Sequence, residues 1–146
     1  MALLEKSFKE LFGILSASRK RCPWARQMTI KEMANCIVLE AKELLEETEK
    51  DSHEEMKEEL GDVLAMCLYF AVLAEEKGYF SVKDSLQNAI EKFKRRKPWI
   101  FKEMGVNTVD QALSLWNEAK QKEKESKALR EPKPGKQSVP RRTSAF

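Results

Sequence analysis

The chain has 146 residues, of which 42% are hydrophobic and 35% are charged. This length fits one domain with a real hydrophobic core, and only five glycines and five prolines argue against a strand-and-turn fold. The formal charge of +3 comes from the end of the chain, where residues 130–146 carry five basic side chains and one acidic one. The charge therefore gives no argument for a nucleic-acid-binding core. No apolar run is long enough to span a membrane, so we expect a soluble, cytoplasmic protein.

Apolar side chains recur at helical spacing along most of the chain, which predicts an all-α protein, an antiparallel bundle of about five helices. Three pairs of residues have the spacing of a capping box, in which two side chains bond to the free amides at a helix start. These pairs are Thr29 and Glu32, Ser52 and Glu55, and Thr108 and Gln111. Ser81 is predicted to cap another helix, and Gly78 to take the left-handed conformation at a helix end. The predicted helices span about residues 4–19, 30–50, 53–77, 82–96 and 109–128.

The second half of the third predicted helix, residues 63–74, is apolar on every side. Such a helix is surrounded either by neighbours in its own chain or by a partner subunit, so we expect an obligate oligomer, most simply a homodimer. Residues 130–146 hold three prolines and almost no core-forming side chains. We therefore predict a helical domain over residues 1–129 and a disordered basic tail over 130–146.

Four carboxylates fall on the core-facing sides of two helices when each residue is advanced by about 100°. They are Glu40 and Glu43 on the second helix and Glu59 and Asp62 on the third, whereas Glu46, Glu49, Glu54 and Glu58 point to solvent. An ionised carboxylate removed from water costs several kcal/mol, so four such groups need a cation. Oxygen ligands favour Mg²⁺, with Mn²⁺ as a substitute. A di-iron site is disfavoured because the only histidine, His53, lies outside the Glu-x-x-His spacing.

Basic side chains that could bind phosphate follow on the fourth helix. Mg²⁺ held by carboxylates usually has phosphate as another ligand. Lys92 and Arg96 lie one helical turn apart and could clamp it. The alternative is a basic helix end that only complements its own dipole.

Several blocks of the sequence match one family in order and spacing. They are CPW at 22–24 followed by Thr29, EAKE at 40–43, EELGDVL at 58–64, EK at 91–92, RR at 95–96, Pro98, Phe101 and WNEAK at 116–120. Over residues 5–122 the chain thereby resembles the MazG-type nucleoside triphosphate pyrophosphohydrolases. The resemblance implies an all-α bundle that binds Mg²⁺ and hydrolyses a nucleoside triphosphate to the monophosphate and pyrophosphate.

The resemblance also implies roles for individual residues. Glu40, Glu43, Glu59 and Asp62 look like the metal ligands and catalytic carboxylates, and Lys92 and Arg96 look like phosphate-binding residues. Trp116 and Lys120 are similar to a pair that contacts the nucleotide, a contact that a dimer interface could supply, and Trp24 belongs to the substrate-binding blocks. The chain departs from the common pattern at Ala25, Met28, Leu39, Lys42, Lys97 and Trp99. These departures concern base preference and rate rather than the metal ligands.

Two readings from other functional classes stay open. One is a non-catalytic helical dimer that binds Mg²⁺ or a nucleotide, for example as a sensor. The other is weak nucleic-acid association through the basic tail, which is disfavoured as the main function because the tail lacks interleaved aromatic residues.

Overall fold

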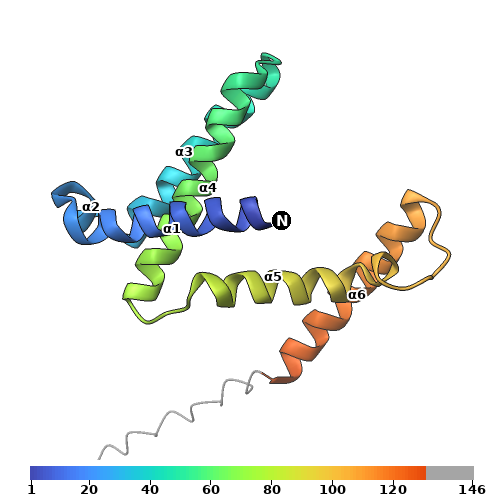
Figure 1. Cartoon of the computed structure of the whole chain (residues 1–146). Helices are drawn as coiled ribbons and strands as arrows, with labels where there is room; N and C mark the ends of the chain where they lie inside the picture. The colour runs from blue at the N-terminus through green and yellow to red at the C-terminus, as the bar shows by residue number, and fades with distance from the viewer. Residues whose placement is uncertain (131–146) are drawn as a thin grey trace, which may run out of the picture. The chain divides into compact units, whose positions relative to one another are not determined.

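A computed structural model describes residues 1–130, and this part of the chain contains helices and connecting segments but no strand (Figure 1). The all-α prediction is therefore confirmed. The elements are α1 (Ala2–Arg21), α2 (Pro23–Gln27), α3 (Ile30–Glu49), α4 (His53–Glu76), α5 (Val82–Arg96), a 3₁₀ helix η1 (Pro98–Ile100) and α6 (Val109–Arg130). No helix among the described residues is both long and apolar enough to cross a membrane. Most of the predicted tail lies outside the described residues.

The helix boundaries follow local side-chain chemistry. Thr29 and Glu32 form the predicted capping box, in which the Glu32 amide donates to Thr29 Oγ1 and the Thr29 amide donates to Glu32 Oε2. Ser81 pairs in the same way with Asp84, and the Thr108–Gln111 box also forms. The Ser52–Glu55 box is wrong, because the Ser52 hydroxyl bonds to the Glu55 carboxylate and caps no backbone amide. Gly78 has a φ of 69°, the left-handed conformation expected after α4.

Two short helices, α2 and η1, were not predicted. Both begin with a proline, Pro23 and Pro98, and in the sequence each of these prolines predicts the end of a helix. Proline is nevertheless well suited to the first position of a helix, because its fixed φ is helical and its missing amide would have no helical partner there. A proline can therefore end one helix and start the next.

The chain divides within α5 into two compact units, Met1–Asn88 and the part that begins at Ala89. In the first unit α3 and α4 run side by side in opposite directions, and α1 crosses α4 (Figure 1). Its core is formed by Leu15, Ala25, Met33, Leu68, Tyr69 and Leu73, of which Met33 and Leu73 are the largest fully buried side chains. The core thus lies where α1 packs against the second half of α4, near the start of α3.

Arg19 fixes the segment between α1 and α3. Its Nη1 donates to the carbonyl oxygens of Ala25 at 2.5 Å and Met28 at 3.3 Å, and its Nε donates to Glu76 at 2.6 Å. The hydrogen bonds from Arg19 lower the pKa of the Glu76 carboxyl. One guanidinium thereby joins α1, the α2 segment and the end of α4.

In the second unit, the end of α5 and α6 meet through side chains. The Phe93 and Trp116 rings lie with centroids 6.3 Å apart, and Arg96 forms an ion pair with Glu123. The described part of this unit thus joins α5 to α6 through an aromatic contact and a charged one.

Candidate functional site

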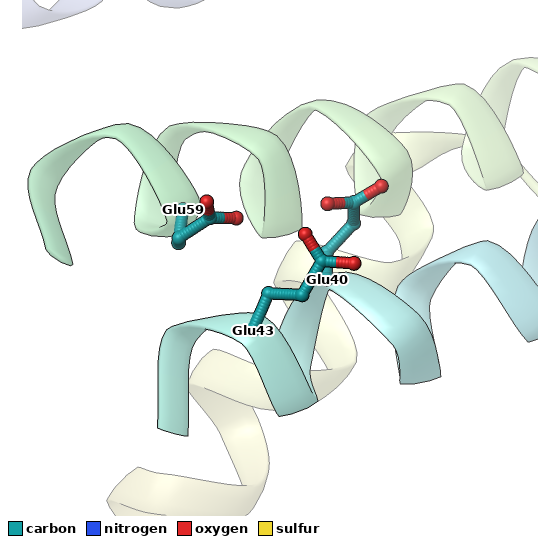
Figure 2. Close-up of side chains that lie close together, drawn as sticks. All are labelled: Glu40, Glu43 and Glu59. Atoms are coloured by element: carbon teal, nitrogen blue, oxygen red, sulfur yellow. The ribbon is translucent and has the colours of Figure 1, made fainter. Parts of the chain in front are cut away.

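Three carboxylates meet between α3 and α4. One carboxylate oxygen from each of Glu40, Glu43 and Glu59 lies within 4.8 Å of the other two, and Figure 2 shows the three side chains turned toward one another from the two helices. We call these three residues the acidic cluster. Glu40 and Glu43 share a face of α3 because three residues make nearly one helical turn. The short turn after α3, in which Asp51 has a φ of 56°, returns the chain so that Glu59 faces them.

The acidic cluster is electrostatically unfavourable as it stands. Burial is the largest cause that raises the pKa of the Glu40 carboxyl, followed by the charges of Glu43 and Asp62. Burial and the neighbouring carboxylates also raise the pKa of Glu59. Like charges held close together and partly removed from water favour the protonated form. A cation placed among these oxygens would remove that penalty.

One oxygen of the acidic cluster points to the same conclusion. Glu59 Oε2 is buried and has no hydrogen-bond partner among the described residues. Buried carboxylate oxygens are normally paired, so an orphaned one needs an explanation such as an ion. Carboxylate oxygens are hard ligands that suit Mg²⁺ or Mn²⁺. The residues of the cluster therefore fit a divalent cation.

Asp62, the fourth predicted ligand, lies outside the group of three converging carboxylates. It is exposed on α4, although its charge contributes to the raised pKa of both Glu40 and Glu59. The four glutamates predicted to face solvent are exposed, as expected: Glu46, Glu49, Glu54 and Glu58. The prediction that all four carboxylates face the core is wrong for Glu43 and Asp62, which are exposed, whereas Glu40 and Glu59 are partly buried. Among the described residues the half of α3 that carries Glu40 and Glu43 packs only against α4, so part of this helix pair stays open to solvent.

A second group of charges lies where α5 meets α6. Glu123 Oε2 accepts from Arg96 Nε at 3.0 Å and from Nη2 at 2.5 Å, while Oε1 accepts from Arg95 Nε at 2.7 Å. Trp116 covers the guanidinium of Arg96, whose Cζ lies 5.2 Å from the ring centroid. We call Arg95, Arg96, Trp116 and Glu123 the guanidinium cluster. Hydrogen bonds from both arginines lower the pKa of the Glu123 carboxyl to about 2.

The remaining predicted substrate-binding residues are distributed over both units. Lys92 is partly buried on α5, and Lys120 is exposed on α6. Trp24 lies on α2 with 65% of its surface exposed, next to the fully buried Ala25. Lys97, which follows α5, places its Nζ 5.5 Å from the Trp116 ring centroid.

Glu123 was not predicted, yet the sequence carries a signal for it. Trp116, Lys120 and Glu123 are spaced at i, i+4 and i+7, which places them on one face of α6. An acidic residue on the face that carries a predicted nucleotide contact is a candidate partner for the arginines of the preceding helix. The sequence alone does not say which arginine it meets.

A hollow of about 430 Å³ lies in the connection between η1 and α6, lined by residues 99–107. None of the predicted site residues lines it. The two charged clusters, rather than this hollow, are therefore the candidate functional features.

Known proteins resemble this chain in both sequence and structure. Residues 28–101 match the family model of the MazG nucleotide pyrophosphohydrolase domain, a range that includes the acidic cluster and the arginines of α5. The crystal structure of a MazG-related protein from Thermotoga maritima superposes with a TM-score of 0.71 at 27% identity, over 77% of this chain and 98% of that one.

Curated relatives are similar over most of this chain. The Bacillus subtilis protein YabN, described as uncharacterized, is 36% identical over 103 residues, which are 70% of this chain and 21% of YabN. A Thermotoga maritima protein named nucleoside triphosphate pyrophosphohydrolase/pyrophosphatase MazG is 33% identical over 82% of this chain and 46% of its own length. An Escherichia coli K12 nucleoside triphosphate pyrophosphohydrolase is 28% identical over 73% and 41%. The chain thus spans less than half the length of these relatives.

The family model covers half of the chain, and the match confirms the resemblance predicted from the sequence blocks. The T. maritima crystal structure has the same all-α fold. This chain belongs to the MazG nucleotide pyrophosphohydrolase domain family.

Proposed function

We propose that this chain hydrolyses nucleoside triphosphates to nucleoside monophosphate and pyrophosphate, with Mg²⁺ as its cofactor and with Mn²⁺ as a substitute. The observation that carries the proposal is the convergence of Glu40, Glu43 and Glu59, with one buried oxygen of Glu59 left without a partner. Membership of the MazG family and the printed names of two relatives support the reaction type.

In this proposal Glu40, Glu43 and Glu59 hold the cation, and Asp62 joins them as the fourth ligand. When bound, the cation supplies neutralisation of phosphate charge and a lowered pKa for the attacking water. In this proposal Glu43 or Glu59 has a second role. Its carboxylate accepts a hydrogen bond from the attacking water and orients that water toward the α-phosphorus.

Cationic and aromatic residues bind the rest of the substrate. Lys92 and Arg96 bind the phosphates and stabilise the negative charge of the departing pyrophosphate. Trp116 and Lys120 contact the nucleotide, and Trp24 offers an exposed ring for a further contact. The sequence contains no glycine-rich phosphate loop, so side chains rather than backbone amides bind the phosphates in this proposal.

The proposed active form is a homodimer. Its proposed role is housekeeping of the nucleotide pool in the cytoplasm. Large apolar side chains on α3 and α4 remain about half exposed: Val38, Leu39, Leu45, Leu60 and Leu64. Exposed apolar side chains in this number favour burial against another subunit. Light scattering at micromolar concentration is expected to give a dimeric mass, and a monomeric mass would contradict this part of the proposal.

The reaction is tested with the purified chain and a panel of ribo- and deoxynucleoside triphosphates, each with Mg²⁺ and with EDTA. We expect monophosphate and pyrophosphate in the presence of Mg²⁺ and no turnover in EDTA. Diphosphate and orthophosphate as products would move the attack to the γ-phosphorus and contradict the proposed mechanism. Nucleotide binding without turnover for every member of the panel would favour the non-catalytic alternative.

A further inference from the structure

Glu123 occupies one edge of the Arg96 guanidinium. Its carboxylate accepts from Nε and Nη2, so Nη1 is the remaining nitrogen of that guanidinium. The side chains of Arg96 and Glu123 are only 19% and 16% exposed. A charge-assisted pair shielded from water in this way holds its geometry better than a surface ion pair does.

Trp116 restrains the same guanidinium from its face. The ring centroid lies 5.2 Å from Arg96 Cζ, within the range of a cation–π contact. Trp116 and Glu123 both belong to α6 and lie two turns apart, so one helix restrains Arg96 from two directions. A free arginine side chain has about 2 kcal/mol of rotamer entropy to lose on binding. Restraining it in advance lowers that cost for a ligand.

The guanidinium cluster keeps a positive charge despite Glu123. Two arginines against one carboxylate leave a net charge of +1, and Lys97 brings a further cation to the Trp116 ring. An anion is therefore still attracted to the cluster. If the cluster served only to join α5 to α6, the bond from Arg95 to the other carboxylate oxygen of Glu123 would be sufficient. The Arg95 side chain is 53% exposed, so it is less restrained than Arg96.

We propose that Glu123 is a positioning residue for phosphate binding, which holds the Arg96 guanidinium against Trp116 so that Nη1 is presented to the pyrophosphate group of the substrate. The inference rests on the proposed function, in which Arg96 binds phosphate. It assigns to α6 a role in preparing the phosphate contact in addition to its nucleotide contact.

The test is calorimetric titration of inorganic pyrophosphate, without divalent cation, into the full chain and its variants. For Glu123→Gln we expect the Kd to rise about tenfold, as is typical when the partner that orients a ligand-binding group is lost. Glu118→Gln is the matched control, because this substitution also removes one negative charge from α6 and Glu118 is exposed. Its Kd should stay at the wild-type value. Tighter binding by Glu123→Gln would make Glu123 a competitor of the phosphate and overturn the inference.

A double-mutant cycle with Arg96 separates positioning from general loosening of the fold. In an Arg96→Met background, Glu123→Gln should have no further effect on pyrophosphate binding, because the residue through which it acts is gone. An equal loss with and without Arg96 would overturn the inference, as would a wild-type chain that binds no pyrophosphate. Circular dichroism of each variant checks that the helices are retained.

Kinetics keep the inference distinct from the proposed function. For Glu123→Gln we expect kcat/KM for the nucleoside triphosphate to fall about tenfold, because Glu123 positions the arginine that binds the phosphates and stabilises the departing pyrophosphate. In the Arg96→Met background the same substitution should cause no further fall, and an unchanged kcat/KM for Glu123→Gln alone would overturn the positioning role. If the chain binds pyrophosphate in a Glu123-dependent way but forms no monophosphate, the proposed reaction fails and the inference stands.

Discussion

The acidic cluster and the guanidinium cluster each contain partly buried charged side chains, but they balance charge differently. In the guanidinium cluster Glu123 lies between two arginines, and its pKa is lowered to about 2. In the acidic cluster three carboxylates face one another, and the pKa values of Glu40 and Glu59 are raised. A charge that the protein pairs internally can position a neighbour. Charges left unpaired favour a ligand from solution, here a cation.

The largest effect is expected when the acidic cluster is reduced. Glu59→Gln keeps the shape of the side chain but removes one charge and one ligand oxygen from the cluster. We expect Mg²⁺-dependent turnover to fall by at least about 100-fold, with little change in helical circular dichroism. The measurement is the rate of pyrophosphate release.

Glu46→Gln is the matched control for that variant. Glu46 lies on α3, three residues after Glu43, and is exposed. Its removal should leave the rate of pyrophosphate release near the wild-type value. Equal losses in the two variants would show that charge on the α3–α4 pair in general, and not the acidic cluster, governs activity.

A smaller effect is expected when the aromatic part of the guanidinium cluster is removed. Trp116→Ala should raise KM about tenfold with a smaller change in kcat, because base stacking on an aromatic ring contributes about 1–3 kcal/mol. Leu113→Ala, about half exposed and one turn earlier on α6, should leave KM unchanged. An unchanged KM for the tryptophan variant would exclude Trp116 from the nucleotide site.

The binding of metal should appear in stability as well as in turnover. At a Mg²⁺ concentration ten times Kd, linkage predicts about 1.4 kcal/mol of added stability for the wild type. For Glu59→Gln that gain should be largely lost, whereas without Mg²⁺ this variant should be at least as stable as the wild type, since one repulsive charge is gone. Thermal unfolding with Mg²⁺ and with EDTA measures both. Equal stabilisation of the two proteins would argue against Glu59 as a ligand.

The smallest effect is expected in the pH dependence of stability, and its sign should differ between the clusters. The pKa values of Glu40 and Glu59 are raised, so the folded protein is stabilised when these carboxyls are protonated. This contribution to the free energy of unfolding is complete below the ordinary pKa of 4.5 and is lost as pH rises through the raised values. Glu123, whose pKa is lowered to about 2, contributes fully above 4.5 and loses its contribution as pH falls toward about 2.

Denaturant unfolding in EDTA, compared with Glu59→Gln and Glu123→Gln, separates these contributions. As pH falls from 7 to 3, the wild type should gain stability relative to Glu59→Gln and lose it relative to Glu123→Gln. Parallel curves for the wild type and either variant would contradict the charge environment described for that residue.

Much of the fold and part of the site could be predicted because they depend on local patterns. Helical periodicity and capping chemistry placed the five long helices to within a few residues of their ends. The same periodicity placed Glu40 and Glu43 on one side of α3, and the structure brings these two, but not Glu46, into the acidic cluster. The angle of a side chain around its helix is a local property, so the sequence contains it.

The features that were missed depend on contacts between distant segments. The pair formed by Arg96 and Glu123 needs α5 and α6 to meet, and the contact of Arg19 with Glu76 joins the first helix to the end of the fourth. Asp62 falls outside the converging carboxylates because the distance across two helices depends on side-chain length and helix separation, which a helical wheel does not contain. Long-range pairing is therefore the part that required the structure.

The short turn at Asp51 has a consequence for how quickly the chain folds. It brings Glu43 and Glu59, which are close in sequence, into one hairpin of helices, and contacts that are local in sequence form early and fast. The repulsion within the acidic cluster then arises as soon as this hairpin of helices forms. A divalent cation should for this reason accelerate refolding, and a stopped-flow trace would show the metal acting on the folding rate as well as on the finished protein.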